Sequence, residues 1–303
     1  MTSAPGATSP VAPLVVETRE QLAEALAATR AAGGRIALVP TMGALHDGHA
    51  GLIRAAAERT GPADTVVASI FVNPMQFGPN EDLARYPRSF DADLQMCADE
   101  GVDLVFAPSV AEVYPGGEPQ ATVDPGPLAG ILEGKVRPTH FRGVLTVVAK
   151  LFGLVRPDLA VFGQKDYQQL VLVRRMVEDL CMGVEVVGAD TVREATGLAL
   201  SSRNQYLDHE QHLEARTLSR ALRAGVEAGE HGGAPALAAA RAVLRETHTV
   251  DLDYLALTSP DLGDPPETGE ARLLVAARVG TTRLIDNTAL VLGTKQATRS
   301  RSS

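Results

Sequence analysis

Two imidazole side chains stand three residues apart in the segment PTMGALHDGH, residues 40–49. The apolar run IALV before the segment is typical of a buried strand, and a helical pattern follows it. His46 and His49 are therefore expected near a helix N-terminus, facing one side, and Gly43 and Gly48 would let the backbone approach a ligand closely. A helix N-terminus favours anions, and imidazoles there can donate to the oxygens of a leaving pyrophosphate. The segment predicts a phosphate site.

Familiar nucleotide and metal signatures do not fit this segment. The spacing G-x-x-x-x-G is that of a Walker loop, but His49 and Ala50 stand where that loop has Lys and Ser or Thr. The dinucleotide fingerprint G-x-G-x-x-G is absent. The pattern H-x-x-H is weak support for a metal, because no neighbouring Cys or Asp cluster completes a ligand set. A structural capping pair or a partial metal site is the alternative to phosphate binding.

Neutral amides follow a second strand pattern, TVVASIFV, in the segment FVNPMQF, residues 71–77. The side chains of Asn73 and Gln76 can both donate and accept hydrogen bonds, which suits a hydroxy acid. Turn chemistry is the alternative, since Asn73 before Pro74 is typical of the start of a loop.

Cationic side chains occur in a third and a fourth segment, GQKDYQQ (163–169) and LALSSRN (198–204). Lys165 would supply a point charge to phosphates, and Asp166 is either a helix cap or a ligand of the ATP ribose. Gln169 would lie one turn into the next helix. Arg203 is a natural partner for phosphate oxygens, although a helix start is the alternative for its serine-rich segment.

The elements that must position these side chains alternate between helix and strand along most of the chain. Parallel strands linked by helices imply right-handed crossovers, and ligands bind at the carboxyl ends of such strands. We expect an α/β fold with a Rossmann-like doubly wound parallel sheet. The expected strands are 36–39, 65–72, 103–106, 159–162 and 184–187, and the expected helices are 18–31, 50–59, 89–100, 141–155 and 167–180.

The pattern changes after about residue 190. Two Ala-rich helices, 207–228 and 236–247, precede three short strand patterns at 252–257, 272–278 and 283–284. This indicates a second, smaller α+β C-terminal domain with an antiparallel or mixed sheet. The predicted organisation is a disordered leader (1–13), a Rossmann-like domain (14–190) and a smaller C-terminal domain (191–303) with a disordered tail from about 294.

The composition of the chain argues against several classes of binding partner. The net charge of −9 over 303 residues, without a long basic run, argues against duplex nucleic acid. The longest apolar stretch is too short to cross a bilayer, so no membrane partner is expected. Cys97 and Cys181 make no disulfide framework and no metal motif, and we expect both to be reduced in the core of a cytoplasmic protein. No Ser-His-Asp or Cys-His arrangement indicates a covalent enzyme intermediate.

Seven segments in order resemble the pantothenate synthetase family: PTMGALHDGH, SIFVNPMQF, YPRSFDAD, RPTHFRGV, FGQKDYQQ, TVREATGLALSSRN and ARLLVAARVGTTRLIDN. HDGH also resembles the HxGH signature of the wider nucleotidylyltransferase-like superfamily. The resemblance implies an AMP-forming ligase in which pantoate attacks the α-phosphate of ATP and the amine of β-alanine then displaces AMP, giving pantothenate. It further implies that the first domain binds ATP and pantoate, that the C-terminal domain is a lid, that Mg²⁺ accompanies the ATP phosphates, and that the chain forms a homodimer.

The same resemblance implies roles for individual residues. His49 matches the proton donor, His46 assists at the phosphates, and Lys165 and Arg203 complete the catalytic set. Gln76 and Gln169 would hold pantoate, with Gln76 also near β-alanine. Asn73, from its residue type and place, is also expected to bind the substrate. The residues implied to contact ATP are Met42, Gly43, Ala44, Leu45, His46, Asp47, Gly48, His49, Gly163, Gln164, Lys165, Asp166, Val192, Leu200, Ser201, Ser202 and Arg203. The matching segments also contain Tyr86, Asp93, Glu133 and His140.

Two positions depart from the family pattern. Gln164 stands where the family usually has Glu, and Leu200 where it usually has Met. Neither removes a proposed phosphate ligand, so activity is expected to survive. The alternatives are a nucleotidylyltransferase with another small acceptor, whose pocket should be basic, and a non-catalytic nucleotide-binding protein.

Overall fold

The computed structural model describes residues 11–78, 83 and 89–293. The chain forms two compact units, Met1–Gly163 with Leu172–Ala189 and Gln164–Val171 with Asp190–Ser303. Most of the expected leader, the tail from 294 and Tyr86 lie outside the described residues. The segment that carries Lys165 therefore belongs with the C-terminal unit, although the strand before it does not.

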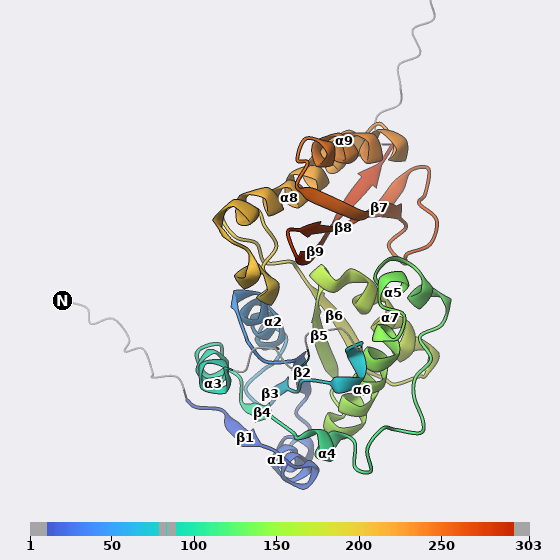
Figure 1. Ribbon diagram of the computed structural model, residues 1–303. Helices are drawn as coiled ribbons and strands as arrows, with labels where there is room; N and C mark the ends of the chain where they lie inside the picture. The colour runs from blue at the N-terminus through green and yellow to red at the C-terminus, as the bar shows by residue number, and fades with distance from the viewer. Residues whose placement is uncertain (1–10, 79–82, 84–88, 294–303) are drawn as a thin grey trace, which may run out of the picture. The chain divides into compact units, whose positions relative to one another are not determined.

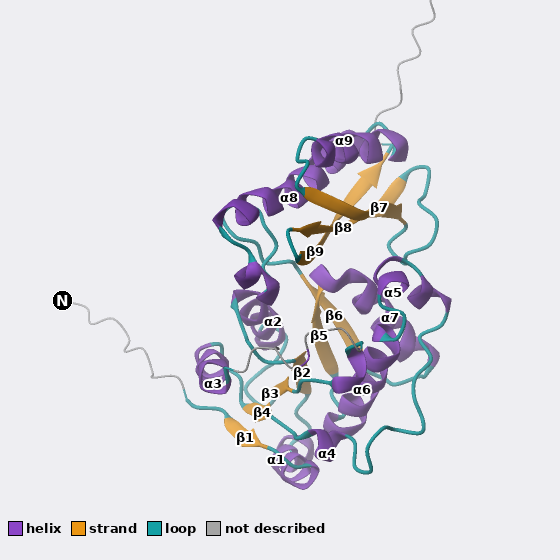
Figure 2. Cartoon of the chain, in the orientation of Figure 1, coloured by secondary structure: helices purple, strands orange, loops and turns teal. Residues whose placement is uncertain are grey.

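The first unit is built on a six-stranded sheet in the order β1-β4-β3-β2-β5-β6 (Figures 1 and 2). Every described strand pair in it is parallel, which confirms the predicted doubly wound sheet. Its strands are β1 (Leu14–Val16), β2 (Ile36–Thr41), β3 (Thr65–Ile70), β4 (Leu104–Phe106), β5 (Leu159–Gly163) and β6 (Glu185–Ala189). The three strands β3, β2 and β5 are neighbours, so their carboxyl ends meet at one edge.

Helices cover both faces of this sheet, with α2 and α3 on one side and α1 and α6 on the other (Figure 1). The longer helices are α1 (Arg19–Ala31), α2 (Asp47–Ala57), α3 (Phe90–Asp99), α6 (His140–Val155) and α7 (Tyr167–Asp179), and the short ones are α4 (Val110–Val113) and α5 (Leu132–Val136). A capping box formed by Thr18 and Gln21 begins α1. Ten buried residues of α6 explain its apolar sequence.

The second unit contains α8 (His209–Gly229), α9 (Gly233–Arg245) and the strands β7 (Val250–Thr258), β8 (Gly269–Val279) and β9 (Thr282–Leu292). The three strands form an antiparallel sheet in the order β7-β8-β9. One side of α8, with Ala215, Leu218 and Leu222, packs with Leu273 and Val275 of β8 into the core of this unit. The expected α+β architecture is confirmed.

Local predictions differ from the structure in several places. The last strand pattern, predicted at 283–284, is the eleven-residue strand β9, and the short helices α4 and α5 were not predicted. The short edge strand β1 was not predicted, because its three residues, two of them exposed, form no periodic pattern. The helix after the first predicted strand begins at Asp47 instead of Ala50, because the side chain of His46 caps it. Cys97 is buried as expected, but the expectation for Cys181 was wrong: it is exposed, in a left-handed conformation (φ 51°) just after α7.

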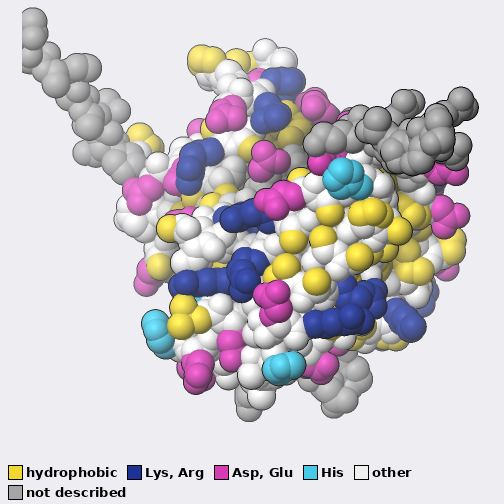
Figure 3. All heavy atoms as spheres, turned by 90° about the horizontal axis from the view of Figure 1, so that it is seen from above, with side chains coloured by type: hydrophobic (Ala, Val, Ile, Leu, Met, Phe, Trp, Pro, Cys, Tyr) yellow, Lys and Arg dark blue, Asp and Glu magenta, His cyan; other side chains and the backbone are white. Residues whose placement is uncertain are grey.

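The surface carries mixed charges. On the face drawn in Figure 3, Lys and Arg side chains form separate groups among acidic ones, and an apolar area lies between them. Among the described residues, no helix is long and apolar enough to cross a membrane.

Candidate active site

His46 and His49 form a reciprocal cap at the start of α2. The Nδ1 atom of His46 accepts a hydrogen bond from the backbone N–H of Gly48 at 3.1 Å, and the Nδ1 atom of His49 accepts from the backbone N–H of His46 at 3.3 Å. The two rings lie 4.3 Å apart between centroids. This confirms that both imidazoles face one side, and it shows that both rings cap the helix, which is the structural alternative given above.

The cap fixes the tautomer of both rings. A nitrogen that accepts a hydrogen bond carries no proton, so each neutral imidazole carries its proton on Nε2. Both Nε2–H groups are therefore donors, at the helix end where the dipole and the first backbone N–H groups favour an anion. Two directed donors beside a helix N-terminus suit phosphate oxygens better than a metal, whose ligand nitrogen must be unprotonated.

The buried carboxylate of Asp93 holds the backbone that leads into this cap. Its oxygens accept hydrogen bonds from the N–H groups of Ala44 at 3.0 Å and Leu45 at 2.8 Å, and from Ser89 Oγ at 2.9 Å. Gly43 (φ 79°) and Ala44 (φ 51°) are both left-handed, a conformation that is unfavourable for Ala44. Asp93, which lies on the neighbouring helix α3, thus stabilises the strained turn at Gly43 and Ala44.

Gln76 lies in a 3-10 turn, Pro74–Gln76, after β3. Its Nε2 atom lies 2.9 Å from Met42 Sδ, and its Oε1 accepts from Asn73 Nδ2 at 3.2 Å. The structure therefore brings together the loops that follow β2 and β3, as predicted. Asn73 is also bonded to Gly143 O and to the hydroxyl of Tyr114, so its side chain holds the turn that carries Gln76.

Residues at the start of α6 and just before it support the same 3-10 turn. His140 Nδ1 and Arg137 Nη2 donate to the backbone oxygen of Gln76, at 2.9 and 3.3 Å. A Cβ atom on Gly143 would overlap the backbone oxygen of Met75, so only glycine allows this approach. The family resemblance had only placed His140 in a matching segment, and the structure gives it this supporting contact.

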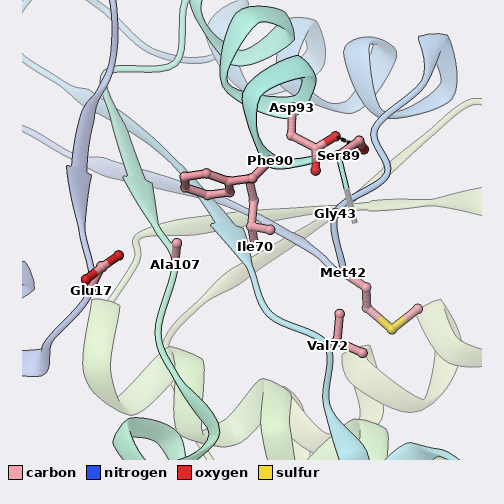
Figure 4. Close-up of a pocket in the computed structure, with 9 residues that line it drawn as sticks. All are labelled: Glu17, Met42, Gly43, Ile70, Val72, Ser89, Phe90, Asp93 and Ala107. Carbon is pink, nitrogen blue, oxygen red and sulfur yellow. Dashed lines mark hydrogen bonds between the residues drawn. The ribbon is translucent and has the colours of Figure 1, made fainter. Parts of the chain in front are cut away.

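A cavity of about 310 Å³ is lined in part by Met42 and Gly43 (Figure 4). Its walls are mostly apolar, and Figure 4 shows the Ser89–Asp93 hydrogen bond at its upper edge. The lining residues are Glu17, Met42, Gly43, Ile70, Val72, Ser89, Phe90, Asp93 and Ala107. Because its ionisable groups are the carboxylates of Glu17 and Asp93, this cavity does not suit the carboxylate of an acid substrate.

In the C-terminal unit, Lys165 lies in a 3-10 turn, Gln164–Asp166, just before α7. Asn287 of β9 donates from Nδ2 to the backbone oxygens of Gln164 at 3.0 Å and Lys165 at 2.8 Å. The guanidinium of Arg272 lies 3.9 Å from the ring centroid of Tyr167. Lys165 Nζ is 3.9 Å from Asp166 Oδ2 and partly exposed.

Gln164, one of the two departures from the family pattern, uses both ends of its amide. Its Nε2 donates to Asp190 Oδ1 at 2.9 Å and its Oε1 accepts from Arg272 Nη2 at 3.2 Å. A carboxylate could accept from Arg272 but could not donate to Asp190. The amide therefore fits its two neighbours here.

The serine- and arginine-containing segment begins with Ser201, whose Oγ accepts from the backbone N–H of Arg203 at 3.3 Å. Glu194 holds this segment by accepting from Asn204 Nδ2 at 3.2 Å and pairing with His212 Nε2 at 2.7 Å. Burial alone would raise the pKa of Glu194, but the hydrogen bond and charge of His212, with smaller contributions from Asn204 and Thr196, outweigh burial and lower it.

The predicted residues thus form two sets. Met42 to His49, Asn73 and Gln76 lie together in the first unit, and Gln164 to Gln169, Val192 and Leu200 to Arg203 lie in the second. Sequence reasoning did not identify Gly143, Arg272 or Asn287, because their contacts are with distant backbone and follow no local pattern. No cluster of three metal-ligating side chains is found among the described residues.

A parallel sheet with two imidazoles at a helix N-terminus near its carboxyl edge is typical of nucleotide-binding α/β proteins. Residues 14–289 match the sequence model of the family described as Pantoate-beta-alanine ligase. The chain belongs to this family, and it is a ligase.

Proteins that are similar in sequence and in structure support this family assignment. The pantothenate synthetase of Nocardioides sp. is 66% identical over 292 residues, which cover 94% of this chain and 87% of that protein. The crystal structure of pantothenate synthetase from Thermus thermophilus is 48% identical with a TM-score of 0.84, covering 91% of this chain and 98% of that one. The pantoate-beta-alanine ligase of Francisella tularensis, complexed with beta-gamma ATP and beta-alanine, is 34% identical with a TM-score of 0.75, covering 91% and 97%.

Proposed function

We propose that this chain catalyses the ATP-dependent condensation of pantoate with β-alanine through pantoyl adenylate, with roles for residues of each set. The observation that carries this proposal is the reciprocal cap of α2, which presents two Nε2–H donors of fixed tautomer at a helix N-terminus. The reaction of the family requires charge stabilisation on a leaving pyrophosphate, and such donors supply it.

In the first step, a carboxylate oxygen of pantoate attacks the α-phosphorus of ATP. A new P–O bond forms, the bond to the β-phosphate breaks, and pyrophosphate leaves with the electron pair. The Nε2–H groups of His46 and His49, with Lys165, Ser201, Ser202 and Arg203, stabilise the negative charge of the phosphates. Met42 to His49 and Gly163 to Asp166 line the nucleotide, with Val192 and Leu200 at the adenine.

In the second step, the amine of β-alanine attacks the acyl carbon of the adenylate. The C–O bond to AMP breaks, AMP leaves, and the nitrogen loses a proton to give the amide of pantothenate. Gln76 and Gln169 hold pantoate, and Gln76 also lies near β-alanine. Asn73 acts through Gln76, because its amide bonds to the Gln76 side chain. A neutral pocket of this kind favours a lightly charged acid over a phosphorylated acceptor.

Magnesium would bind through the ATP phosphates, since Mg²⁺ commonly keeps several waters and is held by substrate phosphates with one or two carboxylates. Neutralising the phosphates is the chemistry that it supplies when bound. We assign no protein ligand to it. The homodimer implied by the family resemblance and the cytoplasmic location expected from the two cysteines are also part of this proposal.

The test is to measure pyrophosphate release from ATP with pantoate, with phosphopantetheine and with a nicotinate nucleotide as acceptors. The proposal expects pyrophosphate release with pantoate and with neither of the other two acceptors. It also expects formation of pantothenate and AMP when β-alanine is added. Release with a phosphorylated acceptor but not with pantoate would assign the chain to a different nucleotidylyltransferase activity.

A further inference from the structure

A pair of adjacent residues on β9, Asp286 and Asn287, touches both cationic segments of the C-terminal unit. Both side chains are buried, each with 3% of its surface exposed. Neither residue bears a chemical group that the proposed reaction needs. Their contacts therefore call for a different explanation.

Asn287 is bonded to the segment that carries Lys165. Its Nδ2 donates to the backbone oxygens of Gln164 and Lys165, at 3.0 and 2.8 Å. Its Oδ1 accepts from Arg272 Nε at 2.8 Å, and Arg272 in turn contacts Gln164 Oε1 and stacks on Tyr167. The backbone of the Lys165 turn is thus held by β9, and the side chains next to Lys165 are contacted by β8, both more than a hundred residues away in sequence.

Asp286 is bonded to the segment that leads to Ser201 and Arg203. Its two oxygens accept from Arg193 Nη1 at 2.6 Å and Nη2 at 2.9 Å, a bidentate pair. Arg193 also donates to Gly197 O at 3.1 Å and pairs with Ala199 in a short antiparallel bridge. The chain runs directly from this bridge into Ser201.

The two residues are also connected to each other. The backbone N–H of Asn287 donates to Asp286 Oδ1 at 2.7 Å, and Arg193 Nη2 reaches Asn287 O at 3.4 Å. The Lys165 segment and the 193–203 segment are therefore attached to one rigid strand through consecutive side chains. Burial of both side chains restricts their rotamers, so the attachment points move little relative to each other.

We propose that Asp286 and Asn287 are positioning residues, which hold Lys165 and the Ser201–Arg203 segment at the fixed separation that the phosphates of one ATP require. This inference rests on the proposed function, because it takes both segments as phosphate ligands. It assigns to the antiparallel C-terminal sheet a specific role in ordering the triphosphate site. Neither residue is expected to touch ATP.

The test compares ATP with AMP, because only ATP presents the β- and γ-phosphates. Asn287→Ala removes the two hydrogen bonds to the Lys165 segment, and the acceptor of Arg272, without adding a charge. ATP binding measured by titration calorimetry is expected to weaken roughly tenfold, the scale of one to two hydrogen bonds, while AMP binding changes less than about twofold. Equal loss for ATP and AMP, or no loss for ATP, overturns the proposal.

Asp253→Asn is the matched control. Asp253 of β7 pairs with Arg283 on the same antiparallel sheet, so this variant weakens an ion pair of the sheet and leaves the hydrogen bonds of Asp286 and Asn287 in place. It is expected to bind both nucleotides as the wild type does. If Asn287→Ala does not fold, as judged by its thermal unfolding, Asn287→Leu replaces it, because Leu has a similar shape and lacks the amide.

A double-mutant cycle with Lys165→Ala separates positioning from general damage. If Asn287 acts through Lys165, Asn287→Ala is expected to have little further effect on ATP affinity once Lys165 is absent. Fully additive losses contradict the inference. A wild-type protein that makes no pantothenate from ATP, pantoate and β-alanine would instead contradict the proposed function, before any variant is compared.

Discussion

The imidazole of His49 accepts a hydrogen bond from the backbone N–H of His46, so one residue of the pair fixes the proton position of the other. Replacing His49 with Ala removes one donor that would face the leaving pyrophosphate. We predict that adenylate formation falls by about 100-fold or more, the scale for one preorganised donor. Single-turnover kinetics with ATP and pantoate measure this rate.

Gln21→Ala is the control for the loss of a helix cap. Gln21 closes the capping box of α1 as His49 closes that of α2, with its Oε1 3.2 Å from the N–H of Thr18. This variant is expected to lose about 1 kcal/mol of stability and no catalytic rate. A His49→Ala enzyme as fast as Gln21→Ala would remove His49 from the mechanism.

Asp93→Asn tests whether the strained turn before α2 depends on a carboxylate. One of the two backbone hydrogen bonds from Ala44 and Leu45 loses its acceptor when an NH₂ group replaces an oxygen. We expect the free energy of unfolding to fall by about 1–3 kcal/mol, and kcat with it, because the turn carries His46. Asp91→Asn, exposed on the same helix, should change neither quantity.

Gly143→Ala tests the support of Gln76 by α6. The added methyl group would overlap the backbone of Met75 and Gln76, so we expect a loss of about 1–3 kcal/mol in stability and a higher KM for pantoate. Gly153→Ala, on the same helix with nothing within 4 Å of its Cβ, should instead stabilise the protein by about 0.5–1 kcal/mol. Denaturant unfolding and steady-state kinetics distinguish the two outcomes.

The two thiols should differ in reactivity. Burial, and then the charge of Asp93, raise the pKa of Cys97 to about 11, whereas Cys181 is exposed. At pH 8 we expect a disulfide reagent such as DTNB to modify one thiol rapidly, and Cys181→Ser to abolish this fast phase. Two fast thiols in the native protein would contradict the burial of Cys97.

The pair of Glu194 and His212 predicts a loss of stability in acid. The pKa of Glu194 in the folded protein lies below its ordinary value of 4.5. The contribution of Glu194 to the free energy of unfolding is therefore complete above pH 4.5, and it is lost as the pH falls through the pKa of the folded protein. Glu194→Gln should flatten this part of a plot of unfolding midpoint against pH, and an unchanged profile would show that the pair contributes nothing.

The sequence predicted the features that follow from local pattern. The buried runs of β2, β3 and β5 identify the sheet edge, and the glycine-bounded turn with its two imidazoles identifies the candidate anion site. What it could not predict depends on contacts between distant residues. Asn287 reaches the Lys165 peptide across 122 residues, and Gly143 approaches Met75 through the packing of α6.

The most direct test of the central claim follows the oxygen atoms of pantoate. When pantoate labelled with ¹⁸O in its carboxylate reacts with ATP and β-alanine, an acyl-adenylate mechanism transfers one labelled oxygen to AMP and keeps the other in the amide of pantothenate. Mass spectrometry of the AMP should show one ¹⁸O atom per molecule. Unlabelled AMP, or label in inorganic phosphate instead, would contradict the account.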